Sequence, residues 1–148
     1  MAEYRIEREV LIDAPVEVVW SAITEPDQIS QWFADRVELD AVPGGRGLMI
    51  FGDQGGPLVV QDVDRPTRFS FRWNHPHDEE PAAGNSLLVE FTLVSEGAEQ
   101  TRLHVVESGL ELLPWPDSEK DRYAEEHNGG WLTFITRLAE MLAGRENR

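Results

Sequence analysis

The sequence contains no cysteine and no long hydrophobic run. The missing cysteine excludes disulfide frameworks, thiolate zinc sites and cysteine nucleophiles. No apolar run approaches the roughly 18 residues that a membrane-spanning helix needs. Basic residues are also scarce, because 13 Lys and Arg stand against 28 Asp and Glu and give a formal net charge of −15. Such a surface repels phosphate, so we expect neither nucleic acid nor a membrane as a partner.

Common catalytic and nucleotide-binding motifs are missing as well. The sequence has no G-x-S-x-G, no G-x-x-x-x-G-K-[ST], and no G-x-G-x-x-G after an expected strand. The glycine-rich residues 44–47 precede a strand and not a helix, so they do not form a phosphate cradle. Hydrolase, nucleotide-binding and redox functions are therefore disfavoured, and no cofactor is expected. The charged, alternating N-terminus does not resemble a signal peptide, which predicts a cytoplasmic protein.

What the sequence does contain is the pattern of one α+β domain. Its 148 residues, 41% of them hydrophobic, predict a single domain over residues 1–148. Asp13 before Pro15 is typical of a helix start, with Asp13 as the cap, and Pro26 opens a second short helix. Period-two alternation predicts seven strands. These expected strands cover residues 4–12, 37–42, 47–51, 58–63, 68–73, 86–95 and 101–108.

The C-terminal region has helical periodicity. Apolar residues recur at i, i+3, i+4 and i+7 between Trp131 and Leu142, which predicts a wide apolar stripe on one helix face. The helix would begin near Asp117 and end near Gly144. Residues 129–130 are both glycine, and each internal glycine costs about 1 kcal/mol relative to alanine. Either one long helix tolerates them, or Asn128 caps a shorter helix.

The order of these elements predicts the architecture. A strongly bent antiparallel sheet needs its concave face covered, and only the last helix is long enough to do this. We therefore expect a helix-grip fold, in which a curved antiparallel sheet of about seven strands wraps around a long C-terminal helix. Two short helices follow the first strand, and space remains between the sheet and the long helix.

Six motifs in this order resemble a known superfamily. The chain is similar to the START-related SRPBCC (Bet v 1-like) proteins and, within them, to homologues of the C-terminal domain of the heat-shock protein 90 ATPase activator. The resemblance implies an internal cavity that holds a small hydrophobic or aromatic, lipid- or polyketide-like molecule. The motifs are IDAPVEVVW (12–20), ISQWF (29–33), PGGR (43–46), DRPTRFSFRW (64–73), TRL with ESGL (101–110) and GGW (129–131).

Aromatic residues supply most candidate ligand contacts. Strand alternation puts those of residues 68–73 on one face, where they would meet the helical stripe. The same residues would equally fill an ordinary core, so the choice between an open cavity and a solid core stays open at this stage. The expected cavity residues are Trp32, Phe33, Phe51, Phe71, Trp73, Phe91, Glu107, Trp115, Trp131 and Ile135.

Glu107 is the one weak catalytic candidate. Alternation groups it with Leu103 and Val105, so it would point inward, unless the strand ends near Val106 and leaves it solvated. A carboxyl group facing an apolar cavity is expected to have a raised pKa. It would then act as a general acid or base, or anchor a ligand hydroxyl.

Other polar candidates are weaker. His104 is out of phase with its inward neighbours and should face solvent. His75 and His77 lie beside carboxylates, but they lack a third fixed ligand, so no metal site is expected. His127 would lie near a cavity mouth. Trp115, between Pro114 and Pro116, would belong either to a lid or to a packed linker.

Three functions remain open from the sequence. The favoured one is a binding module for a small hydrophobic or aromatic molecule, and not an enzyme. The second is a cyclase- or dehydratase-like enzyme that uses Glu107. The third is a stress-response or co-chaperone-like interaction protein, which is disfavoured because the eukaryotic co-chaperone has a second domain that 148 residues do not accommodate. Exposed strand edges would permit a homodimer.

Overall fold

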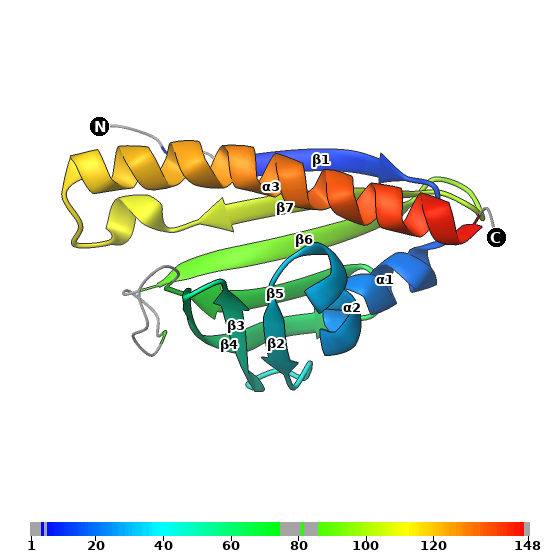
Figure 1. The fold of residues 1–148 in the computed structure, drawn as a ribbon, viewed down its shortest axis with the longest axis horizontal. Helices are drawn as coiled ribbons and strands as arrows, with labels where there is room; N and C mark the ends of the chain where they lie inside the picture. Colours follow the sequence, from blue (N-terminus) through cyan, green and yellow to red (C-terminus); the bar gives the residue numbers. More distant parts are fainter. Residues whose placement is uncertain (1–3, 5, 75–80, 82–85, 147–148) are drawn as a thin grey trace.

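The fold is a curved antiparallel sheet covered by one long helix (Figure 1). The structure, a computed structural model, describes residue 4, residues 6–74, residue 81 and residues 86–146. The seven strands lie in the order β1-β7-β6-β5-β4-β3-β2. The elements are β1 (Ile6–Ile12), α1 (Val16–Thr24), α2 (Pro26–Trp32), β2 (Arg36–Leu39), β3 (Arg46–Phe51), β4 (Gln54–Asp64), β5 (Arg68–Trp73), β6 (Leu87–Ser95), β7 (Thr101–Ser108), the 3₁₀ turn η1 (Leu110–Leu112) and α3 (Asp117–Glu146).

This arrangement confirms the α+β helix-grip fold. Helix α3 runs along the length of the sheet, and α1 and α2 lie beside its C-terminal half (Figure 1). The apolar stripe of α3 is turned inward, since Ile135, Leu138 and Leu142 are fully buried. The face of β5 that carries Phe69 and Phe71 is buried as well, so the sheet and the helix share one core.

The start of α1 differs from the expectation. Pro15, and not Asp13, is the N-cap residue, and no side chain caps the helix. The Asp13 carboxylate instead accepts a hydrogen bond of 2.7 Å from Gln100 Nε2 near the start of β7. The assignment of Asp13 as the cap was therefore wrong, because its carboxylate binds a residue distant in sequence and not the backbone of the helix start.

The turn of the β3–β4 hairpin is shorter than its glycine-rich sequence suggested. The turn at Gly52, with φ of +64°, needs a left-handed conformation, and β4 already begins at Gln54. Gly55 pairs with Ile50 in the ladder. A Cβ on Gly55 would lie 2.2 Å from the carbonyl oxygen of Met49. This glycine therefore permits close approach of two strands and is not part of a wide turn.

Helix α3 is continuous. It spans 30 residues and includes Gly129 and Gly130, so Asn128 does not cap a shorter helix. A Cβ on either glycine would meet no heavy atom within 4 Å. Close packing therefore does not explain the two glycines.

From the sequence, we expected neither a metal site at His75 and His77 nor a membrane-spanning helix. His75 and His77 lie outside the described residues. Among the residues that the structure describes, no group of three His, Cys, Asp or Glu side chains is placed to hold a metal ion. None of the helices in the same part of the chain has the length and apolar character needed to cross a membrane.

Candidate ligand-binding site

Strand β7 carries Glu107 into the core. Its inward residues, Leu103, Val105 and Glu107, are at most 1% exposed. The strand continues to Ser108, so the alternative in which it ends before Glu107 does not hold. An ionised carboxylate is costly to bury unless hydrogen bonds and charges compensate it.

Four side chains provide that compensation. The indole N–H of Trp73 donates to Glu107 Oε2 at 2.8 Å, and the Tyr123 hydroxyl donates to the same oxygen. The indole N–H of Trp131 donates to Oε1 at 3.0 Å, and His127 Nδ1 lies 2.7 Å from Oε1. We call Glu107 with these four partners the carboxylate cluster. It joins β7, β5 and α3 through one buried group.

The cluster reverses the expected effect on Glu107. Burial by itself raises the pKa of this carboxyl group. The charge of His127 and the hydrogen bonds from His127, Tyr123 and Trp131 outweigh burial, so the pKa lies below its usual range. The expectation of a raised pKa was wrong because the sequence did not reveal that donors would surround both oxygens.

Tyr123 and His127 pack against each other within the cluster. Their rings are stacked, with centroids 3.7 Å apart and planes at 18°. Burial, followed by the charge and the hydrogen bond of Glu107, raises the pKa of the Tyr123 hydroxyl well above its usual value. Tyr123 therefore remains a neutral donor, while its ring holds the imidazole in place.

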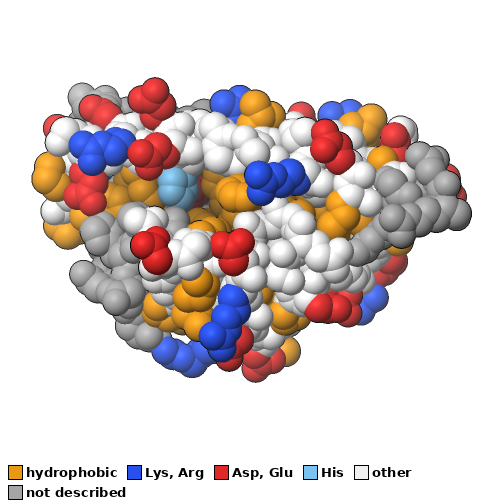
Figure 2. Space-filling view, viewed as in Figure 1, with side chains coloured by type: hydrophobic (Ala, Val, Ile, Leu, Met, Phe, Trp, Pro, Cys, Tyr) orange, Lys and Arg blue, Asp and Glu red, His pale blue; other side chains and the backbone are white. Residues whose placement is uncertain are grey.

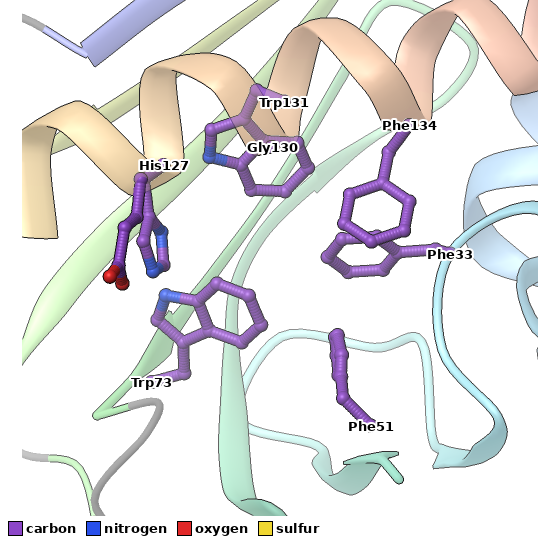
Figure 3. Close-up of a pocket in the computed structure, with 8 residues that line it drawn as sticks. Phe33, Phe51, Trp73, His127, Gly130, Trp131 and Phe134 are labelled. Carbon is purple, nitrogen blue, oxygen red and sulfur yellow. The ribbon is translucent and has the colours of Figure 1, made fainter.

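A pocket opens beside this cluster, below α3 (Figure 3). Its volume is about 250 Å³. In Figure 3 the indole nitrogens of Trp73 and Trp131 point toward the side on which His127 lies. The corresponding face in Figure 2 shows a histidine among hydrophobic side chains, with acidic side chains nearby. The lining residues are Phe33, Phe51, Trp73, Glu126, His127, Gly130, Trp131 and Phe134.

Phe33 stands at the centre of the aromatic lining. It follows α2, as its C-cap residue. Its ring stacks on Trp131 at 5.0 Å between centroids, and on Trp73 at 5.9 Å. Phe51 and Phe134 meet it edge to face at 5.0 and 4.9 Å. One side chain from the second short helix thus organises rings from the sheet and from α3.

The expected cavity residues divide into three groups. Some line the pocket, some are buried in the core around it, and Trp115 packs on Tyr123 with ring centroids 5.4 Å apart. Trp115 is not among the lining residues. Those that line the pocket are Phe33, Phe51, Trp73 and Trp131, and those in the core are Trp32, Phe71, Phe91, Glu107 and Ile135.

Two residues of the cluster were not singled out from the sequence as site residues. Tyr123 was not considered, and His127 was placed only near a cavity mouth. The spacing Tyr123, His127, Trp131 is i, i+4, i+8, so extending the apolar stripe by two turns toward the helix start would have put all three on one face. His104, by contrast, faces outward as expected and lies 3.0 Å from the Glu7 carboxylate.

A comparison with protein families now decides the relationship that the motifs indicated. The family model of the Activator of Hsp90 ATPase homolog 1-like proteins matches residues 13–143. The chain belongs to this family. The match covers most of the chain, including the cluster and the pocket. No curated protein matches the chain.

Solved structures agree with this assignment. The chain is similar to DynU16, a protein in the dynemicin biosynthetic locus, with 31% identity and a TM-score of 0.73 over 96% of the chain. It spans only 48% of the length of DynU16. Protein MLL2253 from Mesorhizobium loti is 28% identical, with a TM-score of 0.75, over 94% of this chain and 96% of that one. The Aha1 dimer from Colwellia psychrerythraea, at 18% identity and a TM-score of 0.75 over 95% and 96%, shares the fold.

Proposed function

We propose that this Activator of Hsp90 ATPase homolog 1-like protein binds a small hydrophobic or aromatic molecule in the pocket beside the carboxylate cluster. The observation that carries the proposal is the composition of the lining, in which five of the eight residues are aromatic. Concave, mostly apolar sites with a few polar groups are typical of small-molecule binding. Family membership alone does not transfer the activator role, because one fold hosts many functions.

The two glycines of α3 provide a test of this proposal. Gly130 lines the pocket and Gly129 does not, although a Cβ on either residue would meet nothing within 4 Å. Gly130→Leu should place a side chain in the pocket, and Gly129→Leu should leave the pocket open. The two variants carry the same chemical change one residue apart on the same helix.

Binding of a panel of apolar aromatic molecules, including naphthalene derivatives, would be measured by tryptophan fluorescence and thermal shift. The wild type and Gly129→Leu should bind the same panel members, and Gly130→Leu should lose at least tenfold in affinity. If no panel member binds, or if both variants bind as the wild type does, the pocket is not the ligand site and the proposal fails.

The enzymatic alternative would have to act through His127. Glu107 is not among the residues that line the pocket, and four donors occupy its oxygens. Direct proton exchange between Glu107 and a ligand therefore requires a rearrangement of the cluster. His127, which lines the pocket, is the residue of the cluster with an ordinary acid–base function.

A further inference from the structure

The rings that line the pocket create a setting that favours positive charge. Five of the eight lining residues are aromatic, and Figure 3 shows their rings gathered below α3. The faces of an aromatic ring carry partial negative charge, and its edges carry partial positive charge. The indole N–H groups of Trp73 and Trp131 are positive edges of this kind, and both donate to Glu107 inside the core. The pocket is thus lined by π-systems whose N–H groups are already engaged, which favours a cation over an anion.

One ring of this lining already contacts a cation. The guanidinium carbon of Arg137 lies 5.4 Å from the centroid of the Phe134 ring, within the range of roughly 6 Å over which cation–π contacts are favourable. Arg137 is exposed and is not among the residues that line the pocket. The chain therefore uses one of these rings to bind a positive group of its own, and that group does not occupy the pocket.

The charged groups at the pocket add to this preference. Glu126 lines the pocket at an exposed position, and the described lining contains neither Lys nor Arg. His127 Nδ1 lies 2.7 Å from Glu107 Oε1, so the ionised carboxylate balances a protonated imidazole and leaves a charge of −1 beside a neutral one. Glu126 adds a further negative charge in either case. The chain as a whole carries a net charge of −15, so the field of the molecule also attracts cations.

We propose that the ligand of this pocket is an organic cation, with an apolar or aromatic body among the rings and an alkylated or protonated amine held by the rings and by the Glu126 carboxylate. The inference rests on the proposed function, since it names the ligand class of the same pocket. Sets of aromatic side chains are a common recognition site for quaternary ammonium groups. An anion would meet like charge and lose hydration without gaining a basic partner.

The test compares phenyltrimethylammonium with tert-butylbenzene. The two probes have the same shape and differ in one positive charge, because nitrogen replaces the central carbon of the tert-butyl group. A pocket that is only apolar would bind the neutral probe more tightly, since the ammonium group would lose hydration without compensation. Here the cation should bind at least about fivefold more tightly than the neutral probe, measured by tryptophan fluorescence and thermal shift.

Two variants with the same change of charge test the role of Glu126. Glu126→Gln removes the carboxylate that lines the pocket, and Glu125→Gln removes an exposed carboxylate that does not. Glu126→Gln should weaken the binding of phenyltrimethylammonium about two- to fivefold and leave that of tert-butylbenzene unchanged. Glu125→Gln should bind both probes as the wild type does. Gly130→Leu should lose the cation, and Gly129→Leu should retain it, if the cation occupies this pocket.

Four results would overturn the inference. The first is equal or tighter binding of the neutral probe by the wild type, which leaves the proposed function intact. The second is an equal effect of the two glutamine variants, because the cation would then respond to the acidic surface as a whole or to neither carboxylate. The third is a cation that Gly130→Leu still binds. The fourth is that neither probe binds, and only the additional failure of the wider apolar panel would overturn the proposed function as well.

Discussion

At the scale of single residues, Glu107 is the group on which the interior of this protein depends. It is 1% exposed and accepts from side chains on β5 and α3. A buried carboxylate with incomplete partners would be strongly destabilising. Its complete set of donors makes Glu107 a connection between the sheet and the helix.

Replacing Glu107 with glutamine should be costly. An amide NH₂ group would face donors that need an acceptor, and His127 would lose its charged partner. We expect Glu107→Gln to lower the free energy of unfolding by about 2–4 kcal/mol, measured by urea denaturation. Glu126→Gln, a change of the same kind at an exposed position, should stay within about 0.5 kcal/mol.

The lowered pKa of Glu107 also predicts how stability depends on pH. The group's pKa is lower in the folded state than its ordinary value of about 4.5, so the unfolded chain binds the proton more readily. The stability that Glu107 contributes is therefore present above about pH 4.5 and lost as the pH falls through the folded-state pKa. Urea denaturation at a series of acidic pH values should show this loss, and Glu107→Gln should show a shallower one. If the free energy of unfolding fell equally steeply with pH in the wild type and in Glu107→Gln, other carboxyl groups would account for the loss of stability.

At the scale of elements, helix α3 has two structural roles. It supplies the buried stripe that closes the sheet, and it carries Tyr123, His127 and Trp131 on successive turns toward Glu107. Gly129 and Gly130 lie between His127 and Trp131, just before the stripe begins. The open space at both positions indicates that they weaken the helix without any packing benefit in the described structure.

Alanine at Gly129 should therefore stabilise the protein. Helix propensity favours alanine over glycine by up to about 1 kcal/mol, which corresponds to roughly 2–4 °C in the midpoint of thermal unfolding for a chain of this size. Gly47→Ala is the contrasting control, because its Cβ would lie 2.6 Å from the Glu38 carbonyl oxygen and should lower the midpoint. A lower midpoint for Gly129→Ala would show that the helix needs flexibility at this point.

At the scale of the whole molecule, acidic residues dominate the charge. A net charge of −15 and a pI of about 4.5 imply self-repulsion in the folded state at neutral pH. Described ion pairs such as Arg65–Glu17 and Arg36–Glu38 are largely exposed, and such pairs contribute little. These exposed ion pairs therefore do little to offset the repulsion among the excess negative charges.

Salt should consequently stabilise the protein at neutral pH. Raising the ionic strength from about 0.01 to 0.1 M shortens the Debye length from about 30 to 10 Å and screens the repulsion. The urea midpoint should rise over this range at pH 7 and change little near pH 4.5, where the net charge vanishes. A midpoint that falls with salt at pH 7 would show that attractive ion pairs outweigh the repulsion.

The homodimer that exposed strand edges would permit stays a prediction, which sedimentation velocity would test.

The sequence alone determined the order of elements and the inward faces of the strands. Period-two alternation on β5 placed Phe71 in the interior, and helical spacing placed Ile135 on the buried stripe. The structure confirms both positions, and it decides for Glu107, which the sequence left either inward or solvated at the end of β7, that the side chain is buried. These features depend on neighbours within a few residues along the chain, and that is why they were predictable. The family resemblance covered the same local motifs.

Only the tertiary structure decided what Glu107 meets. Its partners come from β5 and from two turns of α3, so their meeting depends on strand order and on the rotation of the helix over the sheet. The same arrangement lowered a pKa that burial alone would raise, and it placed His127 in the pocket wall while Phe91 and Ile135 went to the core. Alternation says only that a residue points inward, whereas the charge state of a buried carboxyl group depends on which donors arrive from distant parts of the chain.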